Sequence, residues 1–403
     1  MLVRFAAKSG QLPWTIASAI VGSAATLCLA PAGLGCAAAG NPSNTAYRLA
    51  VRYDVEPASI GLDRVERSER IKTELTRAGE LGFDAVIFEH VEDNERGEML
   101  EAASRCGMVA AVPDRNVQYY LLTGRLPRGY TSVEALLRAK LRGLSGRRGF
   151  AGLSIGRIPQ TRDAGDRLRR TMAAAGELGV PCAVLDGSSV SATAGAGLAV
   201  VDSGDLAGVV TAPRRELGGR SPPHPSAGQD PADDLSDSPL ERLLARYHGE
   251  LAAGRTGGLL VDRFARAPGE RVGLVTVDDT PSAAKLAAVQ GLLGRARRWG
   301  PRLCGFRSEV LKEASSGGGD GISLTVFSQG PRRYVLAYNP SPERYVRGSV
   351  AVPASIGGRP VARLVEVPPT ADLVAGNVFE SQRGGVVIRV DLRPGDAALF
   401  EVF

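Results

Sequence analysis

Acidic side chains stand at the ends of successive apolar segments of this sequence, and one tyrosine and one histidine accompany them. The set is Tyr53, Asp54, Glu89, His90, Asp114, Asp186, Asp202 and Asp262. If the segments are parallel strands, their carboxyl ends meet at one edge of a sheet, and we expect these side chains to gather there. A ring of carboxylates suits glycoside cleavage, which needs one carboxyl group protonated as an acid and a second ionised as nucleophile or base.

The set divides into two predicted roles. Asp262 and Glu89 form the predicted catalytic pair. The predicted substrate-binding residues are Tyr53, Asp54, His90, Asp114, Asp186 and Asp202. An aspartate at the end of a strand is also a common helix cap, and this alternative applies to each aspartate taken singly.

The elements that must position these residues alternate between two hydrophobic periods. Strands are expected at 47–55, 84–91, 108–113, 150–158, 182–186, 198–202, 258–264 and 273–277. Helices are expected at 69–81, 95–106, 133–144, 164–178, 239–253 and 282–299. Two near-copies, 79–86 and 176–184, each place a glycine where a helix ends and a strand follows. The alternation predicts an α/β fold, a TIM-like (β/α)8 barrel over residues 46–306. A doubly wound open sheet is the main alternative.

Two further segments complete the expected organisation. Residues 213–238 are rich in proline and aspartate and poor in large apolar residues, which predicts a mobile insertion in one barrel loop. After a glycine-rich linker at 315–321, short alternating segments separated by Pro, Gly and Asn turns predict an all-β sandwich over 322–403.

This architecture resembles that of secreted glycoside hydrolases, especially β-galactosidase-like and clan A enzymes. The resemblance covers residues 46–403 and includes the strand ending in Tyr338-Asn339-Pro340 and the final segment 390–400. It implies a glutamate acid after strand four and a glutamate nucleophile after strand seven. The fourth expected strand ends instead in Ile155-Gly156, and the seventh ends in Val261-Asp262. A degenerate barrel without catalysis is therefore the alternative to an enzyme.

Other kinds of site have weaker support. Gly152-Leu153-Ser154-Ile155-Gly156 matches the G-x-S-x-G elbow of esterases, but Pro159 follows where the elbow needs a helix. The chain has 3 histidines, and of these only His90 follows a strand, which disfavours a zinc hydrolase. The glycines at 195–197 precede a strand, which is the wrong order for a dinucleotide loop. We expect no metal and no cofactor.

Residues 1–40 have the pattern of an export signal. A charged start is followed by an apolar stretch and then by small residues. Gly33-Leu34-Gly35-Cys36 resembles a lipobox except at Gly33, so lipidation at Cys36, ordinary cleavage and a retained membrane anchor all stay open. Each of these predicts an exported body, whether periplasmic, held in the envelope as a lipoprotein, or extracellular. Cys106, Cys182 and Cys304 have no metal-site or disulfide spacing.

The charge pattern limits the partners. The net charge of +6 comes from 49 basic and 43 acidic residues spread along the chain, without the basic stripe that nucleic-acid binding needs. We therefore expect a carbohydrate substrate or ligand, no nucleic acid, and membrane contact only through an N-terminal lipid or signal anchor. The resulting hypothesis is an exported glycoside hydrolase-like protein acting on poly- or oligosaccharide through paired carboxylates. The alternative is a non-catalytic barrel that binds glycan or a protein partner at the cell envelope.

Overall fold

Most of the chain from residue 47 onward is described in the computed structural model. The described residues are 47–55, 61–156, 158–159, 161–180, 182–184, 198–202, 238–262, 283–311, 321–369, 376–381 and 385–403. The predicted signal at 1–40, the predicted insertion at 213–238 and the predicted strand at 273–277 lie outside these residues, apart from Ser238.

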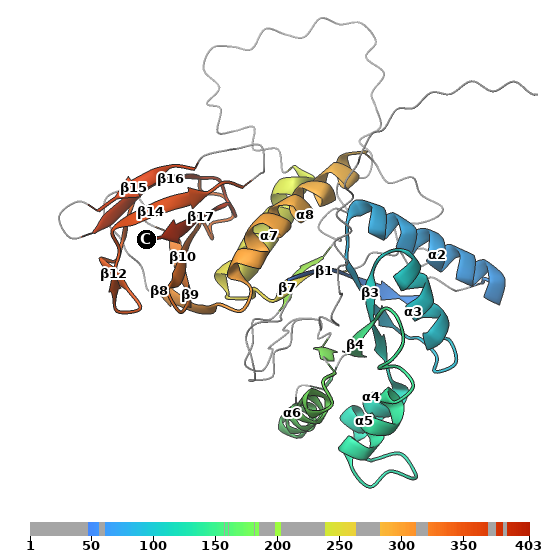
Figure 1. Cartoon of the computed structure of the whole chain (residues 1–403). Coiled ribbons are helices and arrows are strands. Elements are labelled where there is room, and N and C mark those ends of the chain that lie inside the picture. The colour runs from blue at the N-terminus through green and yellow to red at the C-terminus, as the bar shows by residue number, and fades with distance from the viewer. Residues whose placement is uncertain are drawn as a thin grey trace, which may run out of the picture. The chain divides into compact units, whose positions relative to one another are not determined.

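A parallel sheet carries the candidate site residues (Figure 1). Its strands are β1 (Arg48–Asp54), β2 (Ala85–Glu89), β3 (Val109–Pro113), β4 (Phe150–Ile155), β5 (Cys182–Val184), β6 (Leu198–Asp202) and β7 (Gly258–Asp262). All residues of β2 are buried, as in a parallel strand covered on both faces. The sheet order is β5-β4-β3-β2-β1-β7-β6.

Helices connect the strands. They are α2 (Arg64–Leu81), α3 (Arg96–Arg105), α4 (Arg115–Thr123), α5 (Val133–Leu141), α6 (Arg162–Glu177), α7 (Pro239–Ala252) and α8 (Ala283–Leu303). Asp63 and Glu66 form a capping box at the start of α2. The glycines of the two near-copies have φ angles of +100° at Gly82 and +69° at Gly179, so both take the left-handed conformation predicted for them.

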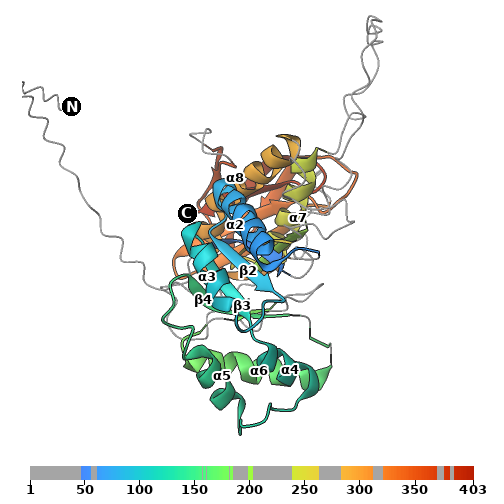
Figure 2. The same cartoon turned by 90° about the vertical axis from the view of Figure 1, so that its right-hand side faces the viewer.

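The described helices pack on one face of the sheet. Val51 and Tyr53 of β1 belong to a core cluster with Ile71 of α2 and Leu292 of α8. The opposite face is lined by a cluster that contains strand residues alone: Ala50, Ala85, Ile87, Ala111, Ala151 and Leu260. Figure 2 shows α2 and α3 together over β2 and β3, and α4, α5 and α6 grouped apart from them. A doubly wound sheet would carry helices on both faces, so the described residues disfavour that alternative.

Strand order gives a second argument. On one side of β1 the strands follow in chain order from β2 to β5, and on the other side β7 comes first and β6 second. The order is therefore cyclic: it would run from β1 to β7 without a break if β5 lay beside β6. A barrel has this cyclic order, whereas a doubly wound sheet reverses direction near its middle. In a (β/α)8 barrel with strands in consecutive order, an eighth strand would lie between β7 and β1, but β7 pairs directly with β1. The prediction of eight strands in consecutive order is therefore wrong at this position.

The C-terminal region is antiparallel. A six-stranded sheet has the order β15-β14-β17-β10-β9-β8, and β11 pairs with β16 in a second sheet. The strands of the whole C-terminal region are β8 (Arg307–Leu311), β9 (Ser323–Gln329), β10 (Arg332–Tyr338), β11 (Val346–Val352), β12 (Ser355–Ile356), β13 (Arg359–Pro360), β14 (Arg363–Val367), β15 (Val378–Glu380), β16 (Val386–Leu392) and β17 (Ala397–Val402). Val350 and Ile388 pack against Leu324 and Phe400 of the larger sheet, as in a two-layer sandwich.

A buried histidine lies where α7 and α8 meet the turn before β17. His248 has 0% exposure, and its Nδ1 donates to the Gly395 carbonyl at 3.1 Å. Arg295 of α8 donates to the other ring nitrogen at 3.0 Å, and the Trp299 ring lies 5.4 Å from the imidazole. Burial, with a further contribution from Arg295, lowers the pKa of His248 to about 3. The parallel and antiparallel regions therefore meet around a neutral imidazole.

None of the described helices is both long enough and apolar enough to cross a bilayer.

Candidate active site

The candidate site lies at the carboxyl ends of β1 and β2, on the face that the described helices leave uncovered. Asp54 is opposite Glu89 in the parallel register, and Arg52 is opposite Ile87. Side chains alternate along a strand, so Arg52, Asp54 and Glu89 share the face of Ala50 and Ile87. This is the edge at which barrel enzymes carry their chemistry.

Glu89 is held by a cation from the neighbouring strand. Arg52 Nη2 lies 2.6 Å from Glu89 Oε2, and Arg52 Nε donates to the same oxygen at 2.8 Å. The exposed fractions are 17% for the Arg52 side chain and 10% for that of Glu89. A charge-assisted hydrogen bond of this kind is stronger than one between neutral groups.

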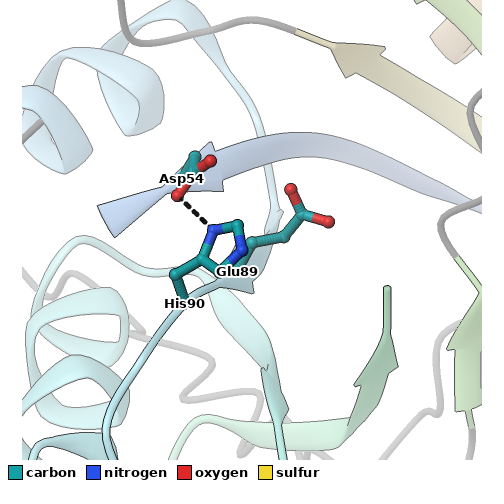
Figure 3. A group of neighbouring side chains, drawn as sticks. All are labelled: Asp54, Glu89 and His90. Atoms are coloured by element: carbon teal, nitrogen blue, oxygen red, sulfur yellow. Dashed lines mark hydrogen bonds and ion pairs between the residues drawn. The ribbon is translucent and has the colours of Figure 1, made fainter. Parts of the chain in front are cut away.

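His90 and Asp54 form the second contact of the site (Figure 3). His90 Nδ1 lies 2.8 Å from Asp54 Oδ1, and the exposed fractions of the two side chains are 56% and 32%. Because the carboxylate accepts, Nδ1 carries the proton and the neutral ring keeps its lone pair on Nε2. In Figure 3 the Glu89 carboxylate points away from this pair. The site therefore combines a carboxylate held by Arg52 with an imidazole held by Asp54.

The backbone of His90 is strained. Its φ angle is +53°, and it is the one non-glycine residue with positive φ among the described residues. The left-handed region costs a non-glycine residue on the order of 1–3 kcal/mol and is found where the surrounding structure imposes it, often at functional sites. The turn after β2 therefore places the imidazole over β1 at an energetic cost.

The same residues include donors that a cation could use. One donor atom each from Asp54, Glu89 and His90 lies within 4.8 Å of the others. However, the Arg52 guanidinium already supplies a positive charge to Glu89 at 2.6 Å. The arrangement favours proton transfer and charge stabilisation over metal binding.

Two residues predicted to bind substrate have structural contacts instead. Tyr53 has 0% exposure, and its hydroxyl donates to the buried Glu74 of α2. Burial, with Glu74 adding to it, raises the pKa of Tyr53 well above its ordinary value. Asp114 is 2% exposed and caps α4 by accepting from the backbone of Asn116 at 2.9 Å. Tyr53 therefore lies on the helix-covered face of β1, and Asp114 fits the alternative in which the aspartate is a helix cap.

Other predicted residues are placed by the backbone alone or not at all. Asp202 and Asp262 are opposite each other at the ends of β6 and β7, and their side chains are not described. Val51 is opposite Val261, so the next residue, Asp262, lies at the level of Arg52. Its strand, β7, pairs with β1 on the side opposite to β2, which carries Glu89. Asp186 and Cys36 lie outside the described residues.

Sequence reasoning missed Arg52, although an arginine two residues before Asp54 in an apolar strand is a signal for a buried ion pair. The serine of the esterase-like motif has a structural contact. Ser154 is 4% exposed within β4, and its hydroxyl donates to the Phe88 carbonyl at 2.7 Å. The next described helix, α6, begins only at Arg162.

No protein-family model and no curated protein matches this sequence. Among solved structures, the chain is similar to an α-amylase from Anoxybacillus, with a TM-score of 0.49 and 12% identity over 88% of this chain and 97% of that one. A noncanonic maltogenic α-amylase from Thermotoga neapolitana has a TM-score of 0.48 and 9% identity over 88% and 98% of the chains. An α-L-fucosynthase from Thermotoga maritima has a TM-score of 0.43 and 9% identity over 89% and 95%. By their names these proteins are glycoside-processing enzymes.

Proposed function

We propose that this chain is an exported glycoside hydrolase-like protein that acts on poly- or oligosaccharide at the carboxyl ends of β1 and β2. One observation carries the proposal. Arg52, Asp54, Glu89 and His90 converge at the edge of the sheet where barrel enzymes react, on the face without described helices.

The proposed chemistry divides between two groups. Glu89, paired with Arg52 at 2.6 Å, is the carboxylate that stabilises or attacks the positively charged sugar carbon. His90 is the group that gives a proton to the leaving oxygen or takes one from water, with Asp54 fixing its tautomer. Asp262 remains the alternative partner for Glu89 in the catalytic pair. It lies beside Arg52 in the strand register, and β1 alone separates its strand, β7, from β2, which carries Glu89.

A closed barrel is part of the proposal. The cyclic strand order leaves β5 and β6 as the two sheet edges, so closure would join these strands. The buried strand-only cluster supports this, since its side chains are 0–8% exposed without a described helix over them. Export through residues 1–40, with or without lipidation at Cys36, and carbohydrate contacts by Asp186 and Asp202 also stay proposals.

Reducing-sugar release from a panel of polysaccharides and aryl glycosides tests the function. The protein without residues 1–40 is compared with Glu89→Gln, His90→Gln and Asp262→Asn, and the exposed Glu101→Gln is the matched control. Loss of a proton-transferring group lowers turnover by about 10²–10⁴-fold, and we expect this for His90→Gln and a loss at least as large for Glu89→Gln. Full activity of both variants, with loss in Asp262→Asn alone, would move the chemistry to β7.

Carbohydrate binding without turnover is the second candidate. The observation that favours it is the close pairing of Glu89 with Arg52, since a carboxylate whose charge is balanced by a guanidinium can accept hydrogen bonds from sugar hydroxyls without catalysis. Calorimetric binding of an oligosaccharide by folded protein that releases no product from it would select this candidate.

A further inference from the structure

The turn after His90 is held by ion pairs to several helices. Its acidic residues are Glu92, Asp93 and Glu95, and each has a basic partner. The pairs are Glu92 with Arg115 of α4 at 3.2 Å, Asp93 with Lys140 of α5 at 3.3 Å and with Arg96 of α3, and Glu95 with Arg67 of α2. Four described helices therefore contact a single turn of five residues, 91–95.

One of these cations is far more buried than the others. The Arg96 side chain is 6% exposed, and its Nη1 lies 2.9 Å from Oδ2 of Asp114, whose side chain is 1% exposed. Its Nη2 pairs with Asp93. Asp114 is fixed in turn, because its other oxygen caps α4. A planar guanidinium can hold two carboxylates in a set geometry, which a lysine cannot do.

The left-handed backbone of His90 needs such support. Its neighbour on one side, Glu89, is fixed within β2, and on the other side Val91 is buried in the main core. Beyond Val91, the backbone N–H groups of Glu95 and Arg96 both donate to the Glu92 carbonyl, at 3.0 and 3.2 Å, which closes the turn. Arg96 joins this turn to the end of β3 through Asp114.

We propose that Arg96 is a positioning residue for His90. Held between Asp93 and Asp114, it fixes the turn 91–95 and so keeps the imidazole against Asp54. The inference rests on the proposed function in that His90 is the proton-transferring group there. Asp114, predicted to bind substrate, contributes by holding Arg96.

The tautomer of His90 is a direct readout that needs no substrate. Nitrogen NMR of the imidazole rings in the full chain, at a pH where they are neutral, reports which nitrogen carries the proton. Donation to Asp54 requires the Nδ1–H form at His90, whereas an unconstrained imidazole favours the Nε2–H form. His248 is an internal reference, because it donates from Nδ1 to Gly395 in another part of the fold. A His224→Gln background removes the third ring.

Arg96→Met is expected to convert His90 to the Nε2–H form and to leave His248 unchanged. Arg96→Lys keeps the charge without the two-carboxylate geometry, so we expect a mixture of the two forms. Arg115→Met is the matched control, since it removes an ion pair of the same turn whose side chains are 64% and 52% exposed. The control should leave His90 in the Nδ1–H form.

Retention of the Nδ1–H form in folded Arg96→Met would overturn the proposal. If Arg96→Met unfolds the chain, the His248 signal changes as well, and Asp114→Asn then decides. Asparagine caps a helix as well as aspartate does, so this variant keeps α4 and removes the charge that faces Arg96. An unchanged His90 in Asp114→Asn would equally overturn the proposal. Loss of sugar release with no change of tautomer would count against the positioning role and leave the proposed function standing.

Discussion

Two histidines of this protein use the same ring nitrogen in opposite surroundings. His90 donates from Nδ1 to a carboxylate and is 56% exposed. His248 donates from Nδ1 to a backbone carbonyl and is fully buried, with an arginine at its other nitrogen. The partner at each nitrogen, rather than the residue type, decides whether a histidine can exchange protons. His248 is locked as a neutral structural group, whereas His90 is largely exposed and faces a carboxylate.

Replacing the two residues should separate these roles most strongly. We expect His248→Ala to lower the free energy of unfolding by about 3–5 kcal/mol, because it removes the acceptor of the half-buried Arg295 and opens a cavity beside Trp299. His90→Ala should change it by less than about 1 kcal/mol, since the side chain is largely exposed. Urea unfolding measures both. Equal losses would remove the distinction between the two sites.

The pH dependence of stability sharpens the comparison. His248 has a folded pKa of about 3 against an ordinary value of 6.5, so its contribution is complete above pH 6.5 and is lost as the pH falls toward 3. The slope approaches one proton, about 1.4 kcal/mol per pH unit. Fluorescence of Trp299 can follow unfolding, because the second of the 2 tryptophans, Trp14, lies in the predicted signal.

The groups facing His248 must be included in that experiment. Arg295 stays charged, whereas burial raises the pKa of Asp396, whose contribution therefore has the opposite sign and is lost as the pH rises through its folded value. The difference between the wild type and His248→Phe isolates the histidine. A difference that does not vary between pH 6.5 and 4 would contradict the burial of a neutral imidazole.

A smaller effect is expected behind the candidate site. Tyr53→Phe removes the hydroxyl that donates to Glu74, and the buried carboxylate keeps Arg70 at 3.2 Å. Loss of one buried hydrogen bond should lower the free energy of unfolding by about 1–3 kcal/mol. Tyr119→Phe is the control, because Tyr119 is 44% exposed. A negligible effect of Tyr53→Phe would show that the buried hydroxyl of Tyr53 contributes no more to stability than the exposed hydroxyl of Tyr119.

Much of the fold followed from local patterns. The expected strand at 198–202 has the observed bounds, strands fill much of the region predicted to be a sandwich, and both predicted glycine caps are present. Helix α4 was missed because Tyr119 and Leu122 are apolar on its exposed side, which blurs the helical period. Strand β8 was missed because four of its five residues are exposed and show no alternation. The place of β7 beside β1 joins residues about two hundred positions apart, which no local pattern reports.

The site was predicted in part for the same reason. Asp54, Glu89 and His90 were recognised because each ends a strand. Tyr53 was grouped with Asp54 although the two are adjacent, and adjacent strand residues point to opposite faces. The contacts that define the site, Arg52 with Glu89 and Asp54 with His90, cross from β1 to β2. They depend on the pairing register, which the spacing of residues along the chain does not reveal.

The pairing of β1 with β7 also bears on how the protein is made. As the chain grows, Arg48–Asp54 emerges early, but the strand that covers its second edge, Gly258–Asp262, follows roughly two hundred residues later. Until then an apolar strand edge stays open, which is a template for aggregation. Contacts of such long range also slow folding. An unfolded passage across a membrane, with folding only after the whole chain is released, would avoid exposing that edge in a half-finished sheet.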